Sequence, residues 1–318
     1  MIFSIIGYLV MVPLSQGNLL VPDSVHYPSI SVVIPSLNQG QYIEETILSV
    51  LGQGYPNLEI IVIDGGSTDN TIEILKKYSG QISYWHSKRD NGQADAINQG
   101  MNMSSGDILC WINSDDMYLP GTLLDVGRKF SRYTDQSHLI YGAAVSIDQS
   151  EGELWSAALS GAPFEASTLT YFDFIVQPSS FWTRELWQRA GQLNTDYEYV
   201  FDWEWFIRAS KITQFEYVPK FYSLYRYHSL HKTARGNAER RKEVLDIVKR
   251  FSSDYWINLN VEVEKYYLQI KKRSKFLDSL RIPKKHLLLP LFFPRIMFIL
   301  RNTQDLYKVL AVYGFFRG

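Results

Sequence analysis

The sequence predicts an α/β protein in which a mostly parallel central sheet has helices on both faces and is followed by a basic helical extension. Three observations predict this fold class. Short apolar runs alternate with segments of helical spacing between residues 31 and 147. Polar clusters follow several of these runs, as they do at the carboxyl ends of parallel strands. Residues 219–318 contain 21 lysines and arginines against 8 acidic residues.

The first elements alternate between strand and helix. Ser31–Pro35 is a β-branched run that ends at a proline, and it predicts a buried strand. Tyr42–Leu51 places apolar side chains at helical spacing, and Glu59–Ile63 predicts a second buried strand. A helix follows over Thr71–Tyr78, with Asp69 available as its N-cap.

The same alternation continues to about residue 147 and then loosens. We expect further strands at Ile82–Trp85, Asp107–Ile112 and His138–Ile147, and further helices at Ala94–Met103 and Thr122–Phe130. Beyond residue 150 we expect a helix over Asp202–Lys211 and a basic helix from about 236 to 257. The predicted domains are an N-terminal apolar extension (1–28), a catalytic domain (29–235) and a basic, aromatic helical extension (236–318).

The N-terminal stretch and the cysteine content give expectations about the location of the protein. The apolar stretch at the N-terminus is about 12 residues long, shorter than the roughly 20 that span a bilayer, and it lacks the basic start and cleavage site of a secretory signal. Cys110 is the only cysteine. An internal disulfide is therefore excluded, which fits the cytoplasm.

Charge is divided unevenly along the chain. Residues 1–218 contain 11 basic and 25 acidic residues, whereas the C-terminal third is strongly basic. Together with the apolar run 286–300, this favours a lipid surface over nucleic acid, for which no motif is present. We therefore expect peripheral docking at the inner face of the cell membrane. Pro290, Pro294 and Arg295 oppose a transmembrane helix; packing of this segment on the catalytic domain or on a second subunit of a homo-oligomer stays open.

Two polar clusters suggest the chemistry. Asp115 and Asp116 follow a fully apolar strand, and adjacent carboxylates at such a position suit Mg²⁺ or Mn²⁺ shared with substrate phosphates. The cluster Asp64–Asp69 also ends a buried strand, and its carboxylate can accept hydrogen bonds from a base or a ribose. It lacks the lysine of a phosphate-binding P-loop, and no GxGxxG fingerprint is present, which argues against a dehydrogenase.

These motifs resemble those of a known family. SVVIPSLNQGQYIEETILSVLGQGYPNLEIIVIDGGSTDNT, followed by DNGQADAINQG and DILCWINSDDMYLPG, resembles the family 2 glycosyltransferases over roughly residues 30–232. The later segments QPSSFWTRELWQRAG, FDWEWFIRAS and YRYHSLHKT fit the same family. The resemblance implies the GT-A nucleotide-diphospho-sugar transferase fold and an inverting, metal-dependent transfer from a nucleotide-diphosphate sugar to a glycan or lipid-linked acceptor, in bacterial surface polysaccharide or glycolipid biosynthesis.

The resemblance also implies roles for individual residues. Those expected to contact the nucleotide sugar are Pro35, Ser36 and Asn38 at the base and ribose, Asp64 at the nucleoside, and Asp90, Gln93 and Asp95 at the nucleoside and donor sugar. Asp115 and Asp116 match the motif that binds the cation on the diphosphate. Arg226 and His228 match basic residues near the pyrophosphate. Asp202 matches the catalytic base, with Glu204 as the alternative.

Three positions depart from the family pattern. Gly65 stands where many members have a second acidic residue, Asn113 replaces the first aspartate of the metal motif, and Leu37 stands at an often aromatic position. These departures leave the donor open but not the class.

Other readings stay open at this stage. A nucleotidyltransferase would show basic residues directly after the first strand, and residues 36–42 have none. An inactive, membrane-attached scaffold is disfavoured because Asp64, Asp115, Asp116 and Asp202 are all present. His228 and His231 as a metal pair are disfavoured against an anion-binding cluster with Arg226 and Lys232. Gln177 fits a ligand contact or a structural hydrogen bond, and the tryptophans near residue 203 fit core packing or a sugar platform.

Overall fold

The structure is a computed structural model that describes residues 27–133, 135–148, 155–159, 162–228, 232, 238–279 and 289–313. The chain divides into two compact units. The sheet unit comprises the described residues of Met1–Phe164, Ile175–Thr195 and Ala209–Tyr227. The helical unit comprises those of Glu165–Phe174, Asp196–Arg208 and His228–Gly318. Residues 1–26 of the expected N-terminal extension lie outside the described residues, and the predicted domain boundaries stay a prediction.

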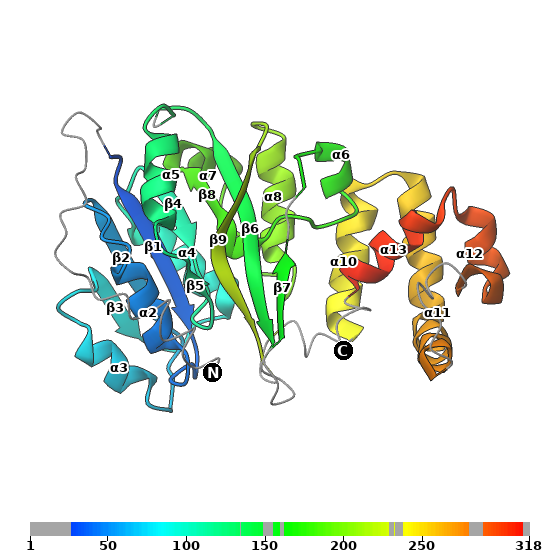
Figure 1. The fold of residues 1–318 in the computed structure, drawn as a ribbon, viewed down its shortest axis with the longest axis horizontal. Coiled ribbons are helices and arrows are strands. Elements are labelled where there is room, and N and C mark those ends of the chain that lie inside the picture. Colours follow the sequence, from blue (N-terminus) through cyan, green and yellow to red (C-terminus); the bar gives the residue numbers. More distant parts are fainter. Residues whose placement is uncertain are drawn as a thin grey trace. The chain divides into compact units, whose positions relative to one another are not determined.

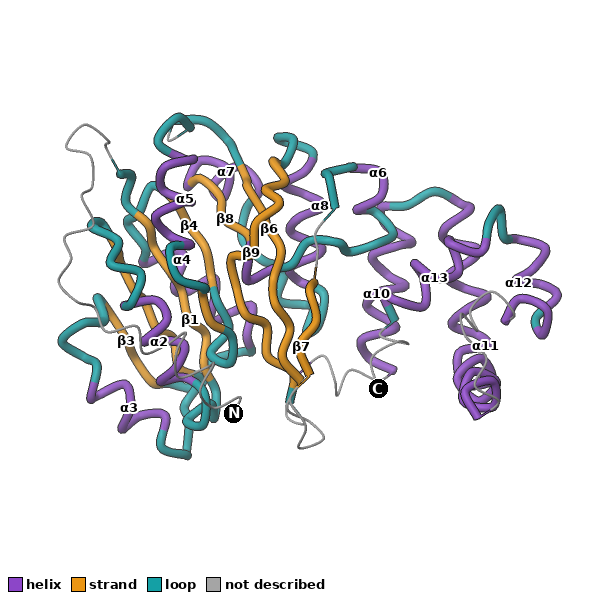
Figure 2. The backbone as a smooth tube through the Cα atoms, viewed as in Figure 1, coloured by secondary structure: helices purple, strands orange, loops and turns teal. Residues whose placement is uncertain are grey.

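The sheet unit is built on one mixed sheet with the strand order β3-β2-β1-β4-β8-β6-β9-β5, and β7 pairs with β6 (Figures 1 and 2). Its strands are β1 (Ile30–Ser36), β2 (Leu58–Asp64), β3 (Tyr84–Ser87), β4 (Ile108–Trp111), β5 (Met117–Tyr118), β6 (Leu139–Asp148), β7 (Trp155–Leu159), β8 (Ser180–Thr183) and β9 (Glu216–Tyr227). Its helices are α2 (Ile43–Leu51), α3 (Thr71–Lys77), α4 (Gln93–Met103), α5 (Thr122–Phe130), the short 3₁₀ helix η1 (Gln177–Ser179) and α7 (Arg184–Ala190).

The register of the parallel strands determines which loops meet. In β1 and β2, Ile30 pairs with Leu58 and Ser36 pairs with Asp64, so both strands end at the same level. The expected parallel arrangement holds for β3, β2, β1 and β4. Beyond β4 the sheet is mixed, because β8 pairs antiparallel with both β4 and β6 while β9 is parallel to β6.

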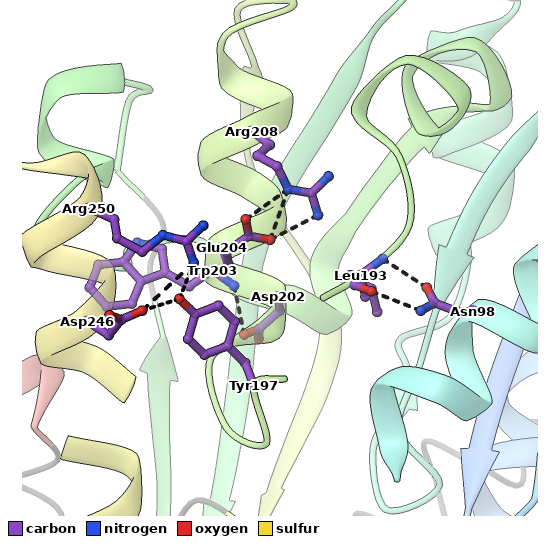
Figure 3. Close-up of polar contacts among 9 residues, drawn as sticks. All are labelled: Asn98, Leu193, Tyr197, Asp202, Trp203, Glu204, Arg208, Asp246 and Arg250. Atoms are coloured by element: carbon purple, nitrogen blue, oxygen red, sulfur yellow. Dashed lines mark hydrogen bonds and ion pairs between the residues drawn. The ribbon is translucent and has the colours of Figure 1, made fainter. Parts of the chain in front are cut away.

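Helices cover both faces of the sheet because alternate strand residues point to opposite sides. On one face, Val32 and Ile34 share a buried cluster with residues of α2, α3 and α5. On the other face, α4 packs so closely on β1 that a Cβ at Gly100 would lie 2.4 Å from Val33 Cγ1. Asn98 of the same helix exchanges two hydrogen bonds of 2.9 and 3.0 Å with the backbone of Leu193 (Figure 3).

The predicted elements agree with most of the structure between residues 30 and 148, where the short strand β5 (Met117–Tyr118) was not predicted, and two predicted elements need correction. The third strand is Tyr84–Ser87 rather than Ile82–Trp85, because Ile82 is a buried residue of the preceding turn and pairing with β2 begins at Tyr84. The expected helix over 236–257 is two helices, α10 (Ala238–Phe251) and α11 (Asp254–Ser279), which are separated at residues 252 and 253.

The helical unit contains α6 (Ala166–Leu169), most of α8 (Phe201–Ser210), α10, α11, the 3₁₀ helix η3 (Leu289–Phe292), α12 (Pro294–Ile299) and α13 (Thr303–Val312). The long helix α11 contacts α10, η3, α12 and α13 (Figure 1). The ring of Tyr171 stacks on Trp256, with centroids 3.5 Å apart. Within the described residues, no helix combines the length and the apolar character that a membrane crossing requires.

Candidate active site

The loops after β1 and β2 are joined into one rigid edge. Asn38 adopts a left-handed backbone conformation (φ 53°), and its side-chain oxygen accepts a hydrogen bond of 2.8 Å from the Thr68 amide. Its own amide donates to Ser67 Oγ at 2.7 Å. Further along the same two loops, the Gly40 backbone amide donates to Asp69 Oδ2 at 2.9 Å. Asparagine tolerates this backbone conformation better than most residues, so Asn38 holds the two loops together.

Asp64 is the organising residue of the second loop. Its carboxylate is fully buried and accepts hydrogen bonds from the Gly66 and Ser67 amides and from the hydroxyls of Ser67 and Ser87, at distances from 2.5 to 3.1 Å. Both oxygens are therefore engaged by the protein. The neighbouring Ser36 hydroxyl is also buried and has no hydrogen-bond partner among the described residues. A buried hydroxyl without a partner is costly, which is consistent with a ligand contact at this point.

Asp90 lies against the backbone where the family usually has a second acidic residue. A Cβ at Gly65 would lie 2.8 Å from Asp90 Oδ2, so only glycine admits the carboxylate there. Asp90 Oδ1 accepts a hydrogen bond of 2.9 Å from the Gly92 amide, and the side chain is partly exposed. Burial raises the pKa of Asp90, and the charges of Asp95 and Asp64 raise it further. The Asp90 carboxylate thus lies near two other acidic groups, and because it is partly exposed its oxygens can accept hydrogen bonds from a ligand.

The start of α4 links this edge to the aspartate pair. Asp95 accepts hydrogen bonds from the Asn91 amide at 3.0 Å and from Gln99, so it orders the N-terminal turn of the helix. Gln93 Nε2 donates to Asn113 Oδ1 at 2.8 Å, and Asn113 Nδ2 donates to Asp116 Oδ2 at 3.4 Å. Asn113, which replaces an aspartate of the family motif, therefore connects Gln93 to Asp116.

The two adjacent aspartates have different surroundings. Asp116 is fully buried, and its Oδ1 accepts the Arg226 backbone amide at 3.0 Å. Burial raises the pKa of Asp116 well above its ordinary range, and the neighbouring Asp115 charge raises it further. Asp115 is 8% exposed. The described residues contain no group of three or more His, Cys, Asp or Glu side chains that could hold a metal ion. A divalent cation beside the pair would relieve the repulsion between the two carboxylates, and Asp115 is the more accessible of the two.

Arg226 is the last of the predicted site residues in the sheet unit. Its guanidinium is buried, forms an ion pair of 2.5 Å with Glu45 and lies 4.9 Å from the centroid of the Tyr42 ring. Burial raises the pKa of Tyr42, while Arg226 lowers it and Asp115 and Glu45 raise it. Tyr42 and Glu45 were not predicted as site residues. Their spacing of three residues at the start of α2 places them on one helix face, which is the signal that was available in the sequence.

The structure therefore brings most of the predicted donor-site residues to one edge of the sheet. The residues joined by these contacts are Asn38, Asp64, Asp90, Gln93, Asp115, Asp116 and Arg226, and Ser36 lies beside Asp64 in the strand register. Pro35 is buried within β1, directly before this edge. Gln177 donates a hydrogen bond of 2.9 Å to the Trp111 carbonyl and is buried, which supports the structural alternative for this residue.

The candidate base lies in the helical unit. Asp202 is the second residue of α8, so it is not at the N-cap position, and its Oδ1 accepts a hydrogen bond of 2.8 Å from the Trp203 amide (Figure 3). Burial raises the pKa of Asp202, opposed by that amide and by the charges of Arg240 and Lys232. Carboxyl groups with a raised pKa are well suited to accept a proton near neutral pH.

Glu204, the alternative base, has a structural partner. It is 3% exposed, and both of its oxygens accept hydrogen bonds from Arg208 Nε at 2.9 and 3.0 Å (Figure 3). Nearby, Arg250 donates to the Tyr197 hydroxyl, which donates to Asp246. Because Arg208 engages both oxygens of Glu204, these contacts favour Asp202 over Glu204 as the candidate base. Trp203 and Trp205 are buried, which supports core packing rather than a sugar platform.

The basic residues after β9 belong to the helical unit. His228 is buried. Lys232 forms an ion pair of 2.7 Å with Glu198. His231, the partner of His228 in the disfavoured metal pair, lies outside the described residues.

Comparisons with known proteins agree with this picture. A sequence model described as glycosyl transferase family 2 matches residues 31–196. A glycosyltransferase of PGL/p-HBAD biosynthesis from Mycobacterium bovis is 29% identical over 186 residues, which are 57% of this chain and 70% of that protein. An uncharacterized glycosyltransferase from Rickettsia felis is 32% identical over 135 residues, which are 42% of this chain but only 22% of that protein. This chain therefore spans about a fifth of that relative's length.

Solved structures show the same fold. S. aureus TarS residues 1–349, in complex with UDP-GlcNAc, superposes with a TM-score of 0.59 at 15% identity, covering 91% of each chain. The mannosyltransferase PcManGT from Pyrobaculum calidifontis, in complex with GDP-Man and Mn²⁺, gives a TM-score of 0.53 at 16% identity, covering 92% of this chain and 89% of that one. The expected GT-A fold is thereby confirmed.

Proposed function

Because this chain belongs to glycosyl transferase family 2, we propose that it transfers a sugar from a nucleotide-diphosphate donor to an acceptor hydroxyl with inversion at the anomeric carbon. The observation that supports this most strongly is the edge of the sheet unit. There the Asp90 carboxylate, the Asp115/Asp116 pair and the Arg226 guanidinium belong to one connected set of contacts. In a nucleotide sugar, a carboxylate such as Asp90 would contact the base or ribose, an aspartate pair would bind the cation, and a guanidinium would contact the diphosphate.

In this proposal the nucleoside binds at the loops after β1 and β2. Asp64 orders the loop through four hydrogen bonds, of which Oδ1 accepts only one, and the proposed ligand contacts are Asp64, Ser36, Asn38 and Asp90. A carboxylate accepts hydrogen bonds from ring N–H groups or from ribose hydroxyls. Asp95 and Gln93 order the start of α4 beside these contacts.

Asp115 and Asp116 would hold Mg²⁺ or Mn²⁺, which when bound neutralises charge on the diphosphate leaving group. Asp116 also positions the backbone of Arg226. The Arg226 guanidinium supplies a second, permanent positive charge for the diphosphate, in exchange for its ion pair with Glu45. The relative PcManGT was solved with GDP-Man and Mn²⁺, which supports a metal-dependent reaction here.

Asp202 would accept the proton of the acceptor hydroxyl as that oxygen attacks the anomeric carbon. The raised pKa of Asp202 and the engagement of Glu204 by Arg208 support this assignment. The hydroxyl oxygen forms the new glycosidic bond, the bond to the diphosphate breaks, and the proton moves to the Asp202 carboxylate. His228 is proposed as a further basic residue for the leaving group.

We propose a glycan or lipid-linked acceptor and a role in bacterial surface polysaccharide or glycolipid biosynthesis, on the cytoplasmic side of the membrane. The M. bovis relative is named PGL/p-HBAD biosynthesis glycosyltransferase, which supports a glycosyl transfer in a biosynthetic pathway. The basic C-terminal third supports the location.

A thermal-shift screen tests the donor class. The protein should melt higher with one nucleotide-diphosphate sugar plus Mn²⁺ from a panel of UDP, GDP and dTDP sugars, because a ligand that binds only the folded state raises apparent stability. A shift with a nucleoside triphosphate and a sugar phosphate, followed by pyrophosphate release, would identify a nucleotidyltransferase instead. Binding of a donor without any transfer or hydrolysis would support the scaffold.

A further inference from the structure

One helix of the helical unit, α11, exposes large apolar side chains in a regular stripe. On α11, the residues Val261, Lys265, Leu268, Lys272 and Phe276 recur at intervals of three or four, which places them on one stripe of the helix. Leu268 is 74% exposed and Phe276 is 52% exposed, and the two lysines between them are exposed as well. Large exposed apolar side chains in a regular stripe mark an interaction surface.

A second group of exposed apolar residues adjoins this stripe. Leu291 and Phe292 of η3 and Met297 and Phe298 of α12 are all exposed, with Phe298 at 90%. The guanidinium of Arg273, at the basic end of α11, lies 5.4 Å from the centroid of the Phe292 ring. The buried ring of Phe293 packs near Tyr266 of α11, with centroids 5.7 Å apart. These contacts fix η3 and α12 on α11, beside the stripe.

Charge around these residues is almost entirely positive. Lys265, Lys271, Lys272 and Arg273 are exposed on α11, and Arg295 is exposed on α12. The two glutamates of α11 are already paired, Glu264 with Arg241 at 3.0 Å and Glu262 with Arg295 at 3.9 Å. Arg295 and Glu262 thereby offset each other, and Asp254 and Asp278 are the other acidic residues in the sequence of α11. The excess positive charge beside the stripe therefore comes from Lys265, Lys271, Lys272 and Arg273.

We propose that this apolar–basic face, formed by the α11 stripe, η3 and α12, docks on an anionic phospholipid bilayer without crossing it. The exposed Leu, Met and Phe side chains enter the boundary between headgroups and acyl chains, and the lysines beside them reach the phosphates. A nucleic acid would match the charge but leave the apolar side chains in water. A second protein subunit would match the apolar groups but leave lysines in a buried interface, where they are depleted.

The test uses the full chain and vesicles of phosphatidylcholine, with or without one third phosphatidylglycerol. The protein should sediment with the anionic vesicles and dissociate at about 1 M salt, where charge interactions are screened. The double variant Phe298→Ser/Leu291→Ser and, separately, Lys265→Gln/Lys272→Gln should each weaken partitioning at least about tenfold. The matched controls are Phe221→Ser, an exposed phenylalanine of the sheet unit, and Lys76→Gln/Arg132→Gln, two exposed basic residues of that unit.

The controls should partition like the wild type, and all variants should retain the wild-type melting temperature and rate of donor hydrolysis. The proposal does not depend on the reaction, so vesicle binding and turnover can fail separately. The proposal would be overturned if the wild type did not bind anionic vesicles. It would also be overturned if both face variants bound these vesicles as strongly as the wild type. Loss of a dimer in Phe298→Ser/Leu291→Ser without vesicle binding would assign the face to a second copy, and salt-sensitive binding of duplex DNA through Lys265 and Lys272 would assign it to nucleic acid. Either result would also overturn the proposal.

Discussion

Replacing Gly65 by alanine should weaken donor binding by displacing one carboxylate. The added Cβ would lie 2.8 Å from Asp90 Oδ2 and 3.2 Å from its Cγ, whereas ordinary contacts begin at 3.4 Å. The carboxylate would have to retreat by about 0.6 Å. Gly65 is not among the glycines with a positive φ, so alanine meets no backbone strain there. The perturbation is therefore confined to the position of Asp90.

The size of the effect follows from the hydrogen bond that Asp90 is proposed to make with the donor. A hydrogen bond to a charged group contributes about 1.5–3 kcal/mol, and each 1.4 kcal/mol is tenfold in affinity. Gly65→Ala should therefore raise the donor Kd by about ten- to hundredfold. The free energy of unfolding should change by about 1 kcal/mol or less, because the partly exposed Asp90 side chain can move toward solvent.

The assay is calorimetric titration of the donor identified by thermal shift, with melting measured in parallel. Gly80→Ala is the matched control, since nothing lies within 4 Å of a Cβ at that glycine, and it should bind donor normally. In an Asp90→Ala background, Gly65→Ala should have no further effect, because the displaced carboxylate is absent. A Gly65→Ala protein with wild-type affinity, or an effect that persists without Asp90, would refute the reasoning.

Three further predictions concern turnover. Asp202→Asn should bind donor with normal affinity and lose at least about a hundredfold in kcat. Glu204→Gln should stay active but lose about 1–3 kcal/mol of stability, because its charged hydrogen bonds to Arg208 are weakened. Loss of kcat in Glu204→Gln with an active Asp202→Asn would move the base to Glu204. Because burial raises the pKa of Asp202, the kcat–pH profile should fall on the acid side above the ordinary carboxyl range of about 4. Since ionisation of this partly buried group opposes folding, Asp202→Asn should melt no lower than the wild type at pH 8. A lower melting temperature would count against the burial argument. Activity should vanish in excess EDTA and return with Mn²⁺, and Asp115→Asn should require far more Mn²⁺; undiminished turnover in EDTA would exclude metal dependence.

The first half of the fold could be predicted because its signals are local. From Ser31 to Ile147 most strands are short apolar runs and the helices have periodic faces, so periodicity identified these elements except the two-residue β5 (Met117–Tyr118) and the exact bounds of β3. The later strands could not be predicted in this way. β8 (Ser180–Thr183) is four residues long, and its antiparallel pairing with β4 and β6 depends on contacts between distant parts of the chain.

The residue types of the candidate site could be predicted from the sequence, whereas the contacts among them could not. The position of Asp64 at a strand end indicated a nucleoside contact, and the structure adds that four donors from its own surroundings hold its carboxylate. Gly65 was recognised as a departure from the family pattern, but its closeness to Asp90 is a three-dimensional fact that spacing does not encode. Similarly, the bond between Gln93 and Asn113 joins two separate loops.

Time-resolved proton NMR of the donor with enzyme and Mg²⁺ tests the central claim most directly, because it reports the leaving group and the anomeric configuration together. With an α-linked nucleotide-diphosphate sugar we predict release of the nucleoside diphosphate and first appearance of the β-configured sugar, on acceptor or on water, with both signals lost in EDTA. Release of pyrophosphate, first appearance of the α anomer, or an unchanged donor under all metal conditions would contradict the proposed inverting, metal-dependent glycosyl transfer.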